Sequence, residues 1–468
     1  MLSVLHIVAA LAVTMDAVLR KRNVRSVIGW VGLAWLAPLA GSAVYVLFGV
    51  NRIRRAAVAL NLRAAGAAPP AETTSEHLAA TGAAADDNLA GLAKLGRQIT
   101  GVARLTGNLI TPLHAGDEAY PAMLGAIDGA TRSITLLTYI FDTDYAGRLF
   151  VDALARARQR GVEVRVLIDA VGARYSRSAM LGLLRDAGVR AAAFLPARTQ
   201  LIRHTNLRNH RKILVVDGET GFTGGMNIRE GHMLRRQPAS PVACLHFEVR
   251  GPVVADMQRV FALDWQFTTG ERLSGAPWFT RVGRAGSVVA RGIPDGPDED
   301  LSKVLEIILG AIAVARRRIR IVTPYFVPDE VVQWSLQVAA LRGVEVDVVV
   351  PDRSNIALVD WAMAPQLPFL IDKGCRVFRT PPPFDHSKVF VVDDAWSLIG
   401  STNWDARSLR LNFEYCIECY DATLAARLNA LIDEKIARAE RMDAGRLRSR
   451  PLPIRLRDGL ARLLTPYL

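Results

Sequence analysis

Two long apolar segments open the chain, and both are candidates for membrane-spanning helices. Residues 26–50 contain no charged side chain over 25 positions, which is long enough to cross a bilayer with some tilt. Residues 1–19 are apolar apart from His6 and Asp16. A signal peptide is disfavoured because no positive charge precedes this run and no small-residue cleavage pattern follows it. The pattern therefore predicts a transmembrane helical hairpin over residues 1–55.

The orientation of this hairpin is left open by the positive-inside rule. Four basic residues lie between the two apolar segments and four follow the second one, so neither side carries an excess. A hairpin nevertheless places the large C-terminal part of the chain on the same side as the N-terminus. The alternative for the second segment is a buried core helix, which its length disfavours.

From about residue 107 onward, the same order of elements occurs twice. Apolar, β-branched runs at 133–141 and 318–326 predict strands, and a helical stretch and a second apolar run follow each of them. Strands that alternate with helices predict crossover connections and a mixed sheet covered by helices. We therefore expect two duplicated α/β/α sandwich halves, at 107–285 and 286–468, related by a pseudo-twofold axis.

Two further segments complete the predicted domain organisation. Residues 56–106 are rich in alanine and include Pro69 and Pro70, which predicts a linker with helical pieces. The basic C-terminal tail, residues 452–468, alternates arginine with leucine. This tail is either an amphipathic helix that lies on lipid or a helix packed on the second half with its arginines in water.

The candidate chemistry lies in a motif that each half contains once. His210 and Lys212 precede one apolar run, and His386 and Lys388 precede another. A spacing of two on a strand directs both side chains to one face. A single histidine before a strand is usually a satisfied polar side chain, but two copies with identical spacing argue against that interpretation. An asparagine follows each histidine by 17 residues (227 − 210 and 403 − 386), at Asn227 and Asn403 in glycine-containing turns.

Four carboxylates accompany these pairs. Asp217 and Asp393 complete the repeated motif and are counted with the catalytic candidates. Their odd spacing of seven from the histidines directs them away, however, and predicts that they anchor the ends of their strands. Glu248 and Glu414, on later strands, are the candidates to hold the second ring nitrogen of a histidine. The alternative for both glutamates is an ordinary solvated carboxylate.

Net charge and cysteine content narrow the choice of partners. A net charge of +13 and a pI of about 10.0 favour nucleic acid, anionic lipid or a phosphate-bearing substrate. Cys416 and Cys419, two of four cysteines, fall on a predicted strand with their thiols on opposite faces, so we expect them to be packing residues. We predict no metal and no cofactor.

The paired residues suit chemistry at a tetrahedral anion. Lysines act as fixed charges and asparagine amides donate hydrogen bonds, so charge on phosphoryl oxygens is stabilised without a metal. One histidine attacks phosphorus, while the other protonates the leaving alcohol and then deprotonates the incoming one. A double displacement therefore explains why the motif occurs twice.

The two motifs resemble those of the phospholipase D superfamily, whose signature is HxKxxxxD followed by a Gly-Gly/Ser-x-Asn turn. The sequences at 206–212, 323–329 and 403–414 are similar to those of membrane-anchored bacterial cardiolipin synthases. Residues 228–232, Ile-Arg-Glu-Gly-His, depart from the more acidic, tyrosine-containing run that is common in that family. This departure concerns the head-group contacts of the acceptor.

The resemblance implies a multi-pass enzyme of the bacterial inner (plasma) membrane. Its substrate would be an anionic phospholipid: a phosphatidyl group passes between two phosphatidylglycerol molecules through a phosphohistidine, giving cardiolipin and glycerol. The alternative is a phospholipase D-type hydrolase, in which water takes the phosphatidyl group. A nuclease of the same superfamily is disfavoured by the two apolar segments and by the lack of an aromatic stacking platform, so no nucleic-acid partner is expected. The intact His–Lys pairs argue against an inactive scaffold.

Overall fold

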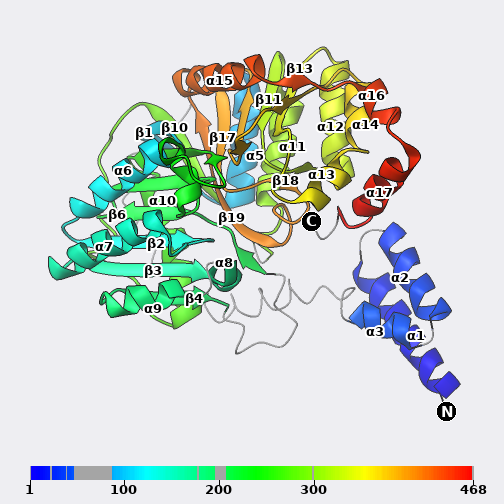
Figure 1. Ribbon diagram of the computed structural model, residues 1–468, viewed down its shortest axis with the longest axis horizontal. Helices are drawn as coiled ribbons and strands as arrows, with labels where there is room; N and C mark the ends of the chain where they lie inside the picture. The colour runs from blue at the N-terminus through cyan, green and yellow to red at the C-terminus, as the bar shows by residue number, and fades with distance from the viewer. Residues whose placement is uncertain are drawn as a thin grey trace.

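One mixed β-sheet runs through both halves of the chain (Figure 1). The computed structural model describes residues 2–21, 24–37, 39–46, 87–175, 179–195, 207–297 and 300–465. The sheet strands of the first half are β1 (Leu105–His114), β2 (Ser133–Thr138), β3 (Glu163–Asp169), β4 (Arg190–Phe194), β6 (Ile213–Val216), β7 (Thr220–Gly224) and β9 (Leu245–Arg250). Those of the second half are β10 (Val288–Asp295), β11 (Arg318–Val322), β13 (Glu345–Pro351), β14 (Arg376–Thr380), β16 (Val389–Val392), β17 (Trp396–Gly400), β19 (Asn412–Tyr420) and β20 (Glu440–Arg441).

The strand order is the same on both sides of the junction between β1 and β10. Outward from this junction, the first half runs β9-β7-β6-β2-β3-β4 and the second runs β19-β17-β16-β11-β13-β14. Antiparallel pairing of β1 with β10 joins the two series. In each of these series the three outer strands are parallel and the inner ones antiparallel, and β20 adds an antiparallel edge strand beside β14. The predicted duplicated α/β halves with mixed sheets are therefore confirmed.

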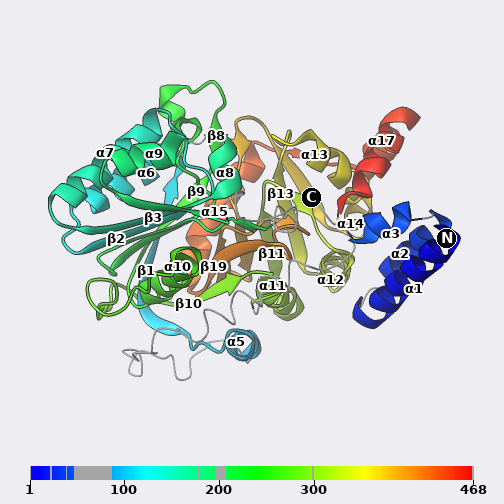
Figure 2. The ribbon, with the colours of Figure 1, turned by 90° about the horizontal axis from the view of Figure 1, so that it is seen from below.

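Helices cover both faces of this sheet (Figure 2). On one face, α6 (Ala115–Asp128) and α7 (Tyr145–Gln159) pack on the first half, while α11 (Lys303–Val314) and α12 (Glu330–Leu341) pack on the second. On the other face lie α10 (Val254–Thr269) and α15 (Ala422–Ala437), where Phe261 and Leu428 belong to one core that both halves share. Because burial of apolar surface drives folding, this shared core holds the halves together.

Short elements complete the fold. The helices among them are α8 (Ala170–Tyr175), α9 (Ala179–Asp186), α13 (Ala357–Met363), α14 (Leu367–Ile371), α16 (Ala444–Arg448) and α17 (Leu452–Arg462). The short strands are β5 (Arg208–Asn209), β8 (Val242–Ala243), β12 (Phe326–Val327), β15 (Phe384–Asp385) and β18 (Trp404–Asp405).

The predicted linker contains one described helix, α5 (Asp87–Thr100). Leu92 of α5 is buried in the core of the second half, and Arg291 donates to the Ala93 carbonyl oxygen at 3.2 Å. This helical piece is thus part of the folded body. Residues 56–86 of the linker lie outside the described residues, and the four segment boundaries stay predictions.

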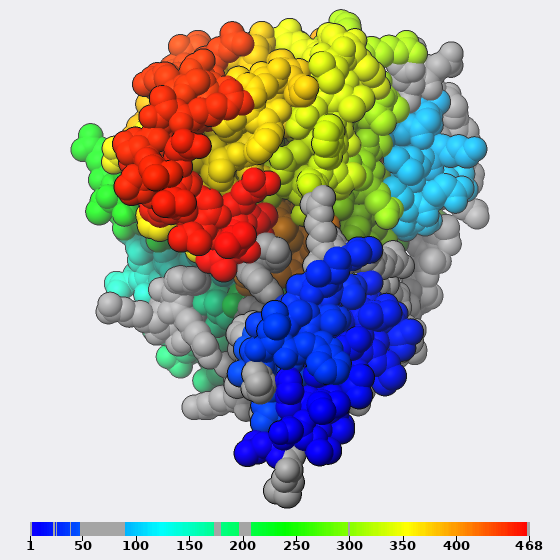
Figure 3. All heavy atoms as spheres, turned by 90° about the vertical axis from the view of Figure 1, so that its right-hand side faces the viewer, coloured from blue at the N-terminus to red at the C-terminus, as the bar shows by residue number. Residues whose placement is uncertain are grey.

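The N-terminal region forms a small cluster of three helices, α1 (Leu2–Arg20), α2 (Val24–Leu36) and α3 (Ala40–Val44). The Tyr45 hydroxyl donates to Asp16 Oδ2 at 2.7 Å, which ties the end of α3 to α1. Figure 3 shows this cluster, in blue, on the same face of the molecule as the red α17.

The two predicted membrane spans differ in the structure. Among the described residues, α1 is the one helix that is long and apolar enough to cross a membrane. In the described part of the predicted span 26–50, α2 ends at Leu36 and α3 begins at Ala40, so this span stays a prediction. Residues 38 and 47–50 lie outside the described residues.

Candidate active site

Each His–Lys motif docks on a strand of the other half. β5 pairs in parallel with β19, and the His210 N–H donates to the Phe413 carbonyl oxygen at 2.9 Å. In the equivalent place, β15 pairs with β8, and the His386 N–H donates to the Ala243 carbonyl oxygen at 2.7 Å. These reciprocal contacts bring the two motifs together at the junction of the halves.

The lysines are held in the same way in both halves. Lys212 Nζ donates to the His210 carbonyl oxygen at 2.6 Å, and Lys388 Nζ donates to that of His386 at 2.7 Å. Burial lowers the pKa of Lys212 to about 7 and that of Lys388 to about 8. Because burial disfavours the charged form of both lysines, an anion bound beside them would stabilise their ammonium groups.

A carboxylate from the second half supports the histidine of the first half. Glu414 Oε1 and Oε2 lie 2.9 Å and 3.0 Å from His210 Nδ1. Burial alone would raise the pKa of Glu414, but the nearby His210 and Lys212 and the Ser401 hydroxyl bring it below its usual value. Burial lowers the pKa of His210 to about 4, although Glu414 opposes this shift. The contact fixes the ring and leaves Nε2 as the nitrogen that is available for chemistry.

His386 has a different partner. Its Nδ1 lies 2.8 Å from the carbonyl oxygen of Gly225, so no carboxylate contacts that nitrogen among the described hydrogen bonds. Burial and the nearby Lys388 and Lys212 lower the pKa of His386 well below its ordinary value. A Cβ at Gly225 would lie 2.4 Å from the His386 carbonyl oxygen, which explains the glycine here. The two histidines are therefore not equivalent.

The two asparagines lie in the turns that follow β7 and β17. Asn227 Oδ1 accepts the Ile140 N–H at 3.2 Å, and Asn403 Nδ2 donates to Ser408 Oγ at 3.1 Å. Asn403 Oδ1 is buried without a hydrogen-bond partner in the described structure. If the Asn403 amide is rotated by 180°, Ser408 donates to Oδ1 and the amide nitrogen is free to donate elsewhere.

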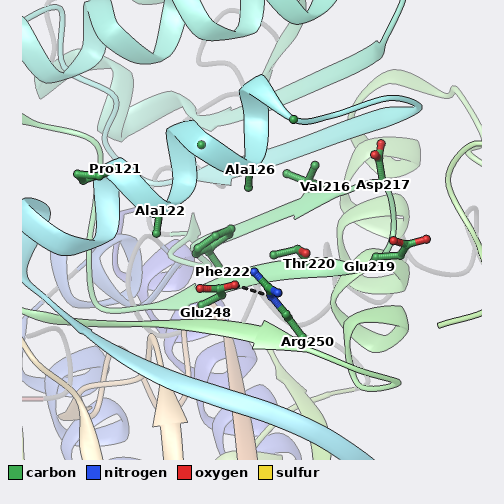
Figure 4. A pocket seen from close by; sticks show the side chains of 12 residues that line it. Pro121, Ala122, Ala126, Val216, Asp217, Glu219, Thr220, Phe222, Glu248 and Arg250 are labelled. Carbon is green, nitrogen blue, oxygen red and sulfur yellow. Dashed lines mark hydrogen bonds and ion pairs between the residues drawn. The ribbon is translucent and has the colours of Figure 1, made fainter. Parts of the chain in front are cut away.

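The structure corrects the prediction for Glu248. Its Oε1 accepts from Arg250 Nε at 2.6 Å, and Figure 4 shows the pair in a shallow pocket beside α6. The register explains the error: Glu248 is opposite Phe222, as Glu418 is opposite Leu398. Glu248 is thus the equivalent of Glu418, and it contacts no histidine among the described hydrogen bonds.

The structure places Asp217 and Asp393 away from the histidines, so their inclusion with the catalytic candidates is corrected. Asp217 accepts the backbone N–H groups of residues 131, 132 and 133 at 2.8–2.9 Å. Asp393 likewise accepts those of residues 316, 317 and 318 at 2.6–2.9 Å. Figure 4 shows Asp217 in the same outer pocket as Glu248. Both aspartates anchor the start of the neighbouring strand.

Two tyrosines beside the histidines were missed from the sequence. The Tyr139 ring centre lies 5.2 Å from that of His210, and Lys212 Nζ lies 5.6 Å from the Tyr139 ring centre. The Tyr325 ring centre lies 6.0 Å from that of His386. Tyr139 lies one residue after β2 and Tyr325 three residues after β11, and a tyrosine shortly after the corresponding strand of each half was the available signal.

Two more buried histidines lie near the site. His232 Nδ1 is 3.1 Å from the Val242 carbonyl oxygen, and burial lowers the pKa values of His232 and His246 to about 3. Among the described residues, no three His, Cys, Asp or Glu side chains are grouped as metal ligands would be. Cys416 and Cys419 are both buried on β19.

Comparisons with known proteins agree with this geometry. A family described as cardiolipin synthase, phospholipase D-like domain, matches residues 123–263 and 308–436. The chain is 33% identical to a cardiolipin synthase of Staphylococcus aureus (strain N315), over 75% of this chain and 72% of the relative. It is also 33% identical to the major cardiolipin synthase ClsA of Bacillus subtilis (strain 168), over 77% and 76%.

A solved structure shares the fold at lower identity. Phosphatidylserine synthase from Haemophilus influenzae Rd KW20 superposes with a TM-score of 0.62 at 16% identity, covering 80% of this chain and 100% of that chain.

Proposed function

Because the chain belongs to the cardiolipin synthases, phosphatidyltransferases of the phospholipase D superfamily, we propose that it joins two phosphatidylglycerol molecules into cardiolipin and glycerol. The observation that carries the proposal is the reciprocal docking of the two motifs, which places two histidines and two lysines in one buried site. Such a site suits a phosphodiester, whose reaction passes through a five-coordinate, anionic phosphorus.

His210 is the proposed nucleophile. Glu414 accepts the proton of Nδ1, so the lone pair of Nε2 points into the site. Attack forms a bond between Nε2 and phosphorus, and the bond from phosphorus to the glycerol oxygen breaks. The carboxylate stabilises the positive charge that develops on the ring. His386 has a neutral carbonyl as its partner, so the same charge would be less stable there.

His386 is the proposed acid and base. Its Nδ1–H donates to Gly225, and a bound phosphodiester anion favours protonation of its Nε2. That proton passes to the departing glycerol oxygen in the first step. The neutral Nε2 then removes a proton from the hydroxyl of the second phosphatidylglycerol, which attacks phosphorus and releases His210. The proton balance therefore closes over one cycle.

Lys212, Lys388, Asn227 and Asn403 are the proposed phosphate-binding residues. The buried ammonium groups place two positive charges beside the phosphoryl oxygens. The Oδ1 atom of Asn227 is occupied by a backbone N–H, which leaves its amide nitrogen to donate. These groups are in place before the reaction, so little reorganisation accompanies the change of charge.

The full chain supplied with isotopically labelled phosphatidylglycerol tests this function. Mass spectrometry of the lipids is expected to show labelled cardiolipin together with free glycerol, and neither product with His210→Ala. Phosphatidic acid without cardiolipin would instead identify a phospholipase D-type hydrolase, in which water replaces the second lipid at the same residues.

Membrane association accords with the family and with the apolar helix α1. We further propose a multi-pass arrangement in the bacterial plasma membrane, in which the apolar segment that begins in α2 returns the chain to the side of its N-terminus. Fluorescent and phosphatase reporters fused to either end of the chain test this topology. A hairpin places both ends in the same compartment, whereas reporters active on opposite sides contradict it.

A further inference from the structure

The outward face of the C-terminal helix α17 is apolar. Asp458 and Ala461 are buried on its inner side, where α17 packs on α13. The Arg457 guanidinium lies 4.4 Å from the ring centre of Trp361, a residue of α13, and this contact holds the helix in one orientation. With 3.6 residues per turn, the exposed leucines fall on the opposite side. They are Leu452, Leu456, Leu460, Leu463 and Leu464.

Two neighbouring helices extend this apolar surface. Phe369 on α14 is 53% exposed, and its ring centre lies 5.7 Å from the Arg462 guanidinium of α17. On the other side, α14 contacts α12, where Trp334 is 62% exposed. The exposed apolar residues of α12 form one stripe at helical spacing: Val331, Trp334, Val338 and Leu341. We call this stripe, Phe369 and the α17 leucines the apolar outer face.

The charges of α17 favour an anionic partner. Arg455 and Arg462 are exposed beside the leucines of α17. The carboxylate of α17, Asp458, is buried and paired with Arg450 and Arg457, so the exposed charged side chains among the described residues of α17 are all positive. Leucines flanked by arginine are typical of helices that lie in the interface of an anionic bilayer. A second copy of this chain would instead bring arginines against arginines.

We propose that the apolar outer face rests on an anionic phospholipid bilayer, so that the second half binds the membrane surface through α12, α14 and α17. A large exposed apolar surface on a folded domain calls for such a partner. Figure 3 shows α17 and the N-terminal helices on the same face, which lets one bilayer contact both. This surface is separate from the catalytic site and does not depend on the proposed reaction.

A polarity-sensitive fluorophore at Leu456→Cys tests the proposal in the full chain. The four native cysteines are buried, so a thiol reagent labels the new cysteine selectively. The protein is reconstituted into phosphatidylcholine vesicles with or without phosphatidylglycerol, and brominated lipids serve as quenchers. We expect a blue shift and several-fold stronger quenching with phosphatidylglycerol present. The matched control is Ala426→Cys, an exposed position on α15 that lies on the opposite face of the sheet.

The other outcomes overturn the proposal. Equal quenching at positions 456 and 426 would mean that the apolar outer face is exposed to water and does not contact the bilayer. A blue shift that persists in detergent without phospholipid and grows with protein concentration would identify a second copy as the partner. The same measurements in a His210→Ala background are expected to be unchanged, so failure of the catalytic proposal is distinguishable from failure of this one.

Discussion

Cys244 occupies in the first half the position that Glu414 occupies in the second. In the first half, Gly224 at the end of β7 pairs with His246, two residues after Cys244. In the second half, Gly400 at the end of β17 pairs with Cys416, two residues after Glu414. Glu414 contacts Nδ1 of His210, whereas Cys244 Sγ lies 3.3 Å from the carbonyl oxygen of His386. The two halves therefore have similar backbones, but at this position one carries a carboxylate and the other a thiol. This difference underlies the different roles that we propose for the two histidines.

Glu414→Gln is expected to reduce kcat by roughly 10²- to 10⁴-fold, because a neutral amide stabilises the charged ring poorly. Synthesis of labelled cardiolipin by the purified full chain measures the effect. Glu248→Gln is the matched control: it removes a carboxylate whose partner is Arg250, and we expect turnover close to that of the unchanged protein. Normal activity of Glu414→Gln would remove this residue from the mechanism.

His386→Ala is expected to accumulate the phosphohistidine when the first step no longer needs an acid. A phosphatidyl ester of p-nitrophenol has such a leaving group, so His210 attacks while the second step lacks its base. Stopped-flow absorbance should show a burst of about one p-nitrophenolate per site, and peptide mass spectrometry should find the adduct on His210.

His210→Ala serves as the paired variant in that experiment, and no burst is expected from it. An adduct on His386 in His210→Ala would reverse the proposed roles of the two histidines.

Much of this site follows from local patterns in the sequence. The His–Lys spacing, the β-branched runs and the glycine-containing turns are each contained within about twenty residues, and their repetition predicts two similar halves. The orientation of Asp217 follows from strand geometry in the same way. The identity of the carboxylate beside His210 does not, because residues 210 and 414 meet only through the pairing of β5 with β19.

The error over Glu248 has a physical reason. Glu248 and Glu414 follow similar letters, Leu-His-Phe and Leu-Asn-Phe, yet the sheet registers make Glu248 equivalent to Glu418. The displacement is four residues, an even number, so the alternation of inward and outward side chains is the same in both alignments. Pattern analysis of a single sequence cannot detect a register shift of this kind.

The lowered pKa values of Lys212 and Lys388 predict that activity is lost at alkaline pH. Burial lowers the pKa of Lys212 to about 7 and that of Lys388 to about 8, so their charges disappear as the pH rises through this range. kcat/KM is therefore expected to fall above about pH 7 to 8, since it reports groups of the free enzyme. A bound phosphodiester stabilises both ammonium groups, so kcat should fall at a higher pH. Profiles of both constants measured in mixed micelles test this, and a kcat/KM that stays constant to pH 9 would contradict it.

Asp217→Asn is expected to lower stability far more than turnover. Three backbone N–H groups and the Thr131 hydroxyl donate to the carboxylate, and an amide nitrogen in its place would face donors. We expect a loss of about 1–3 kcal/mol in the free energy of unfolding. Turnover well below the unfolding transition should stay within a few-fold, because the described contacts of Asp217 do not reach a histidine.

The pH dependence of the stability lost in Asp217→Asn tests whether the charge of the Asp217 carboxylate is the source of that stability. Burial would raise the pKa of Asp217, but the N–H groups of residues 131–133 outweigh burial and lower it below 3.8. A lowered pKa in the folded state contributes stability above the unfolded value, and this contribution is lost as the pH falls through the folded value. Scanning fluorimetry in detergent should therefore find a large difference in Tm between Asp217→Asn and the unchanged protein at pH 7, and a smaller one below about pH 4.

Asp152→Asn, on the exposed face of α7, controls for loss of a surface charge. A Tm equal to that of the unchanged protein, together with turnover as low as that of His210→Ala, would return Asp217 to the catalytic residues.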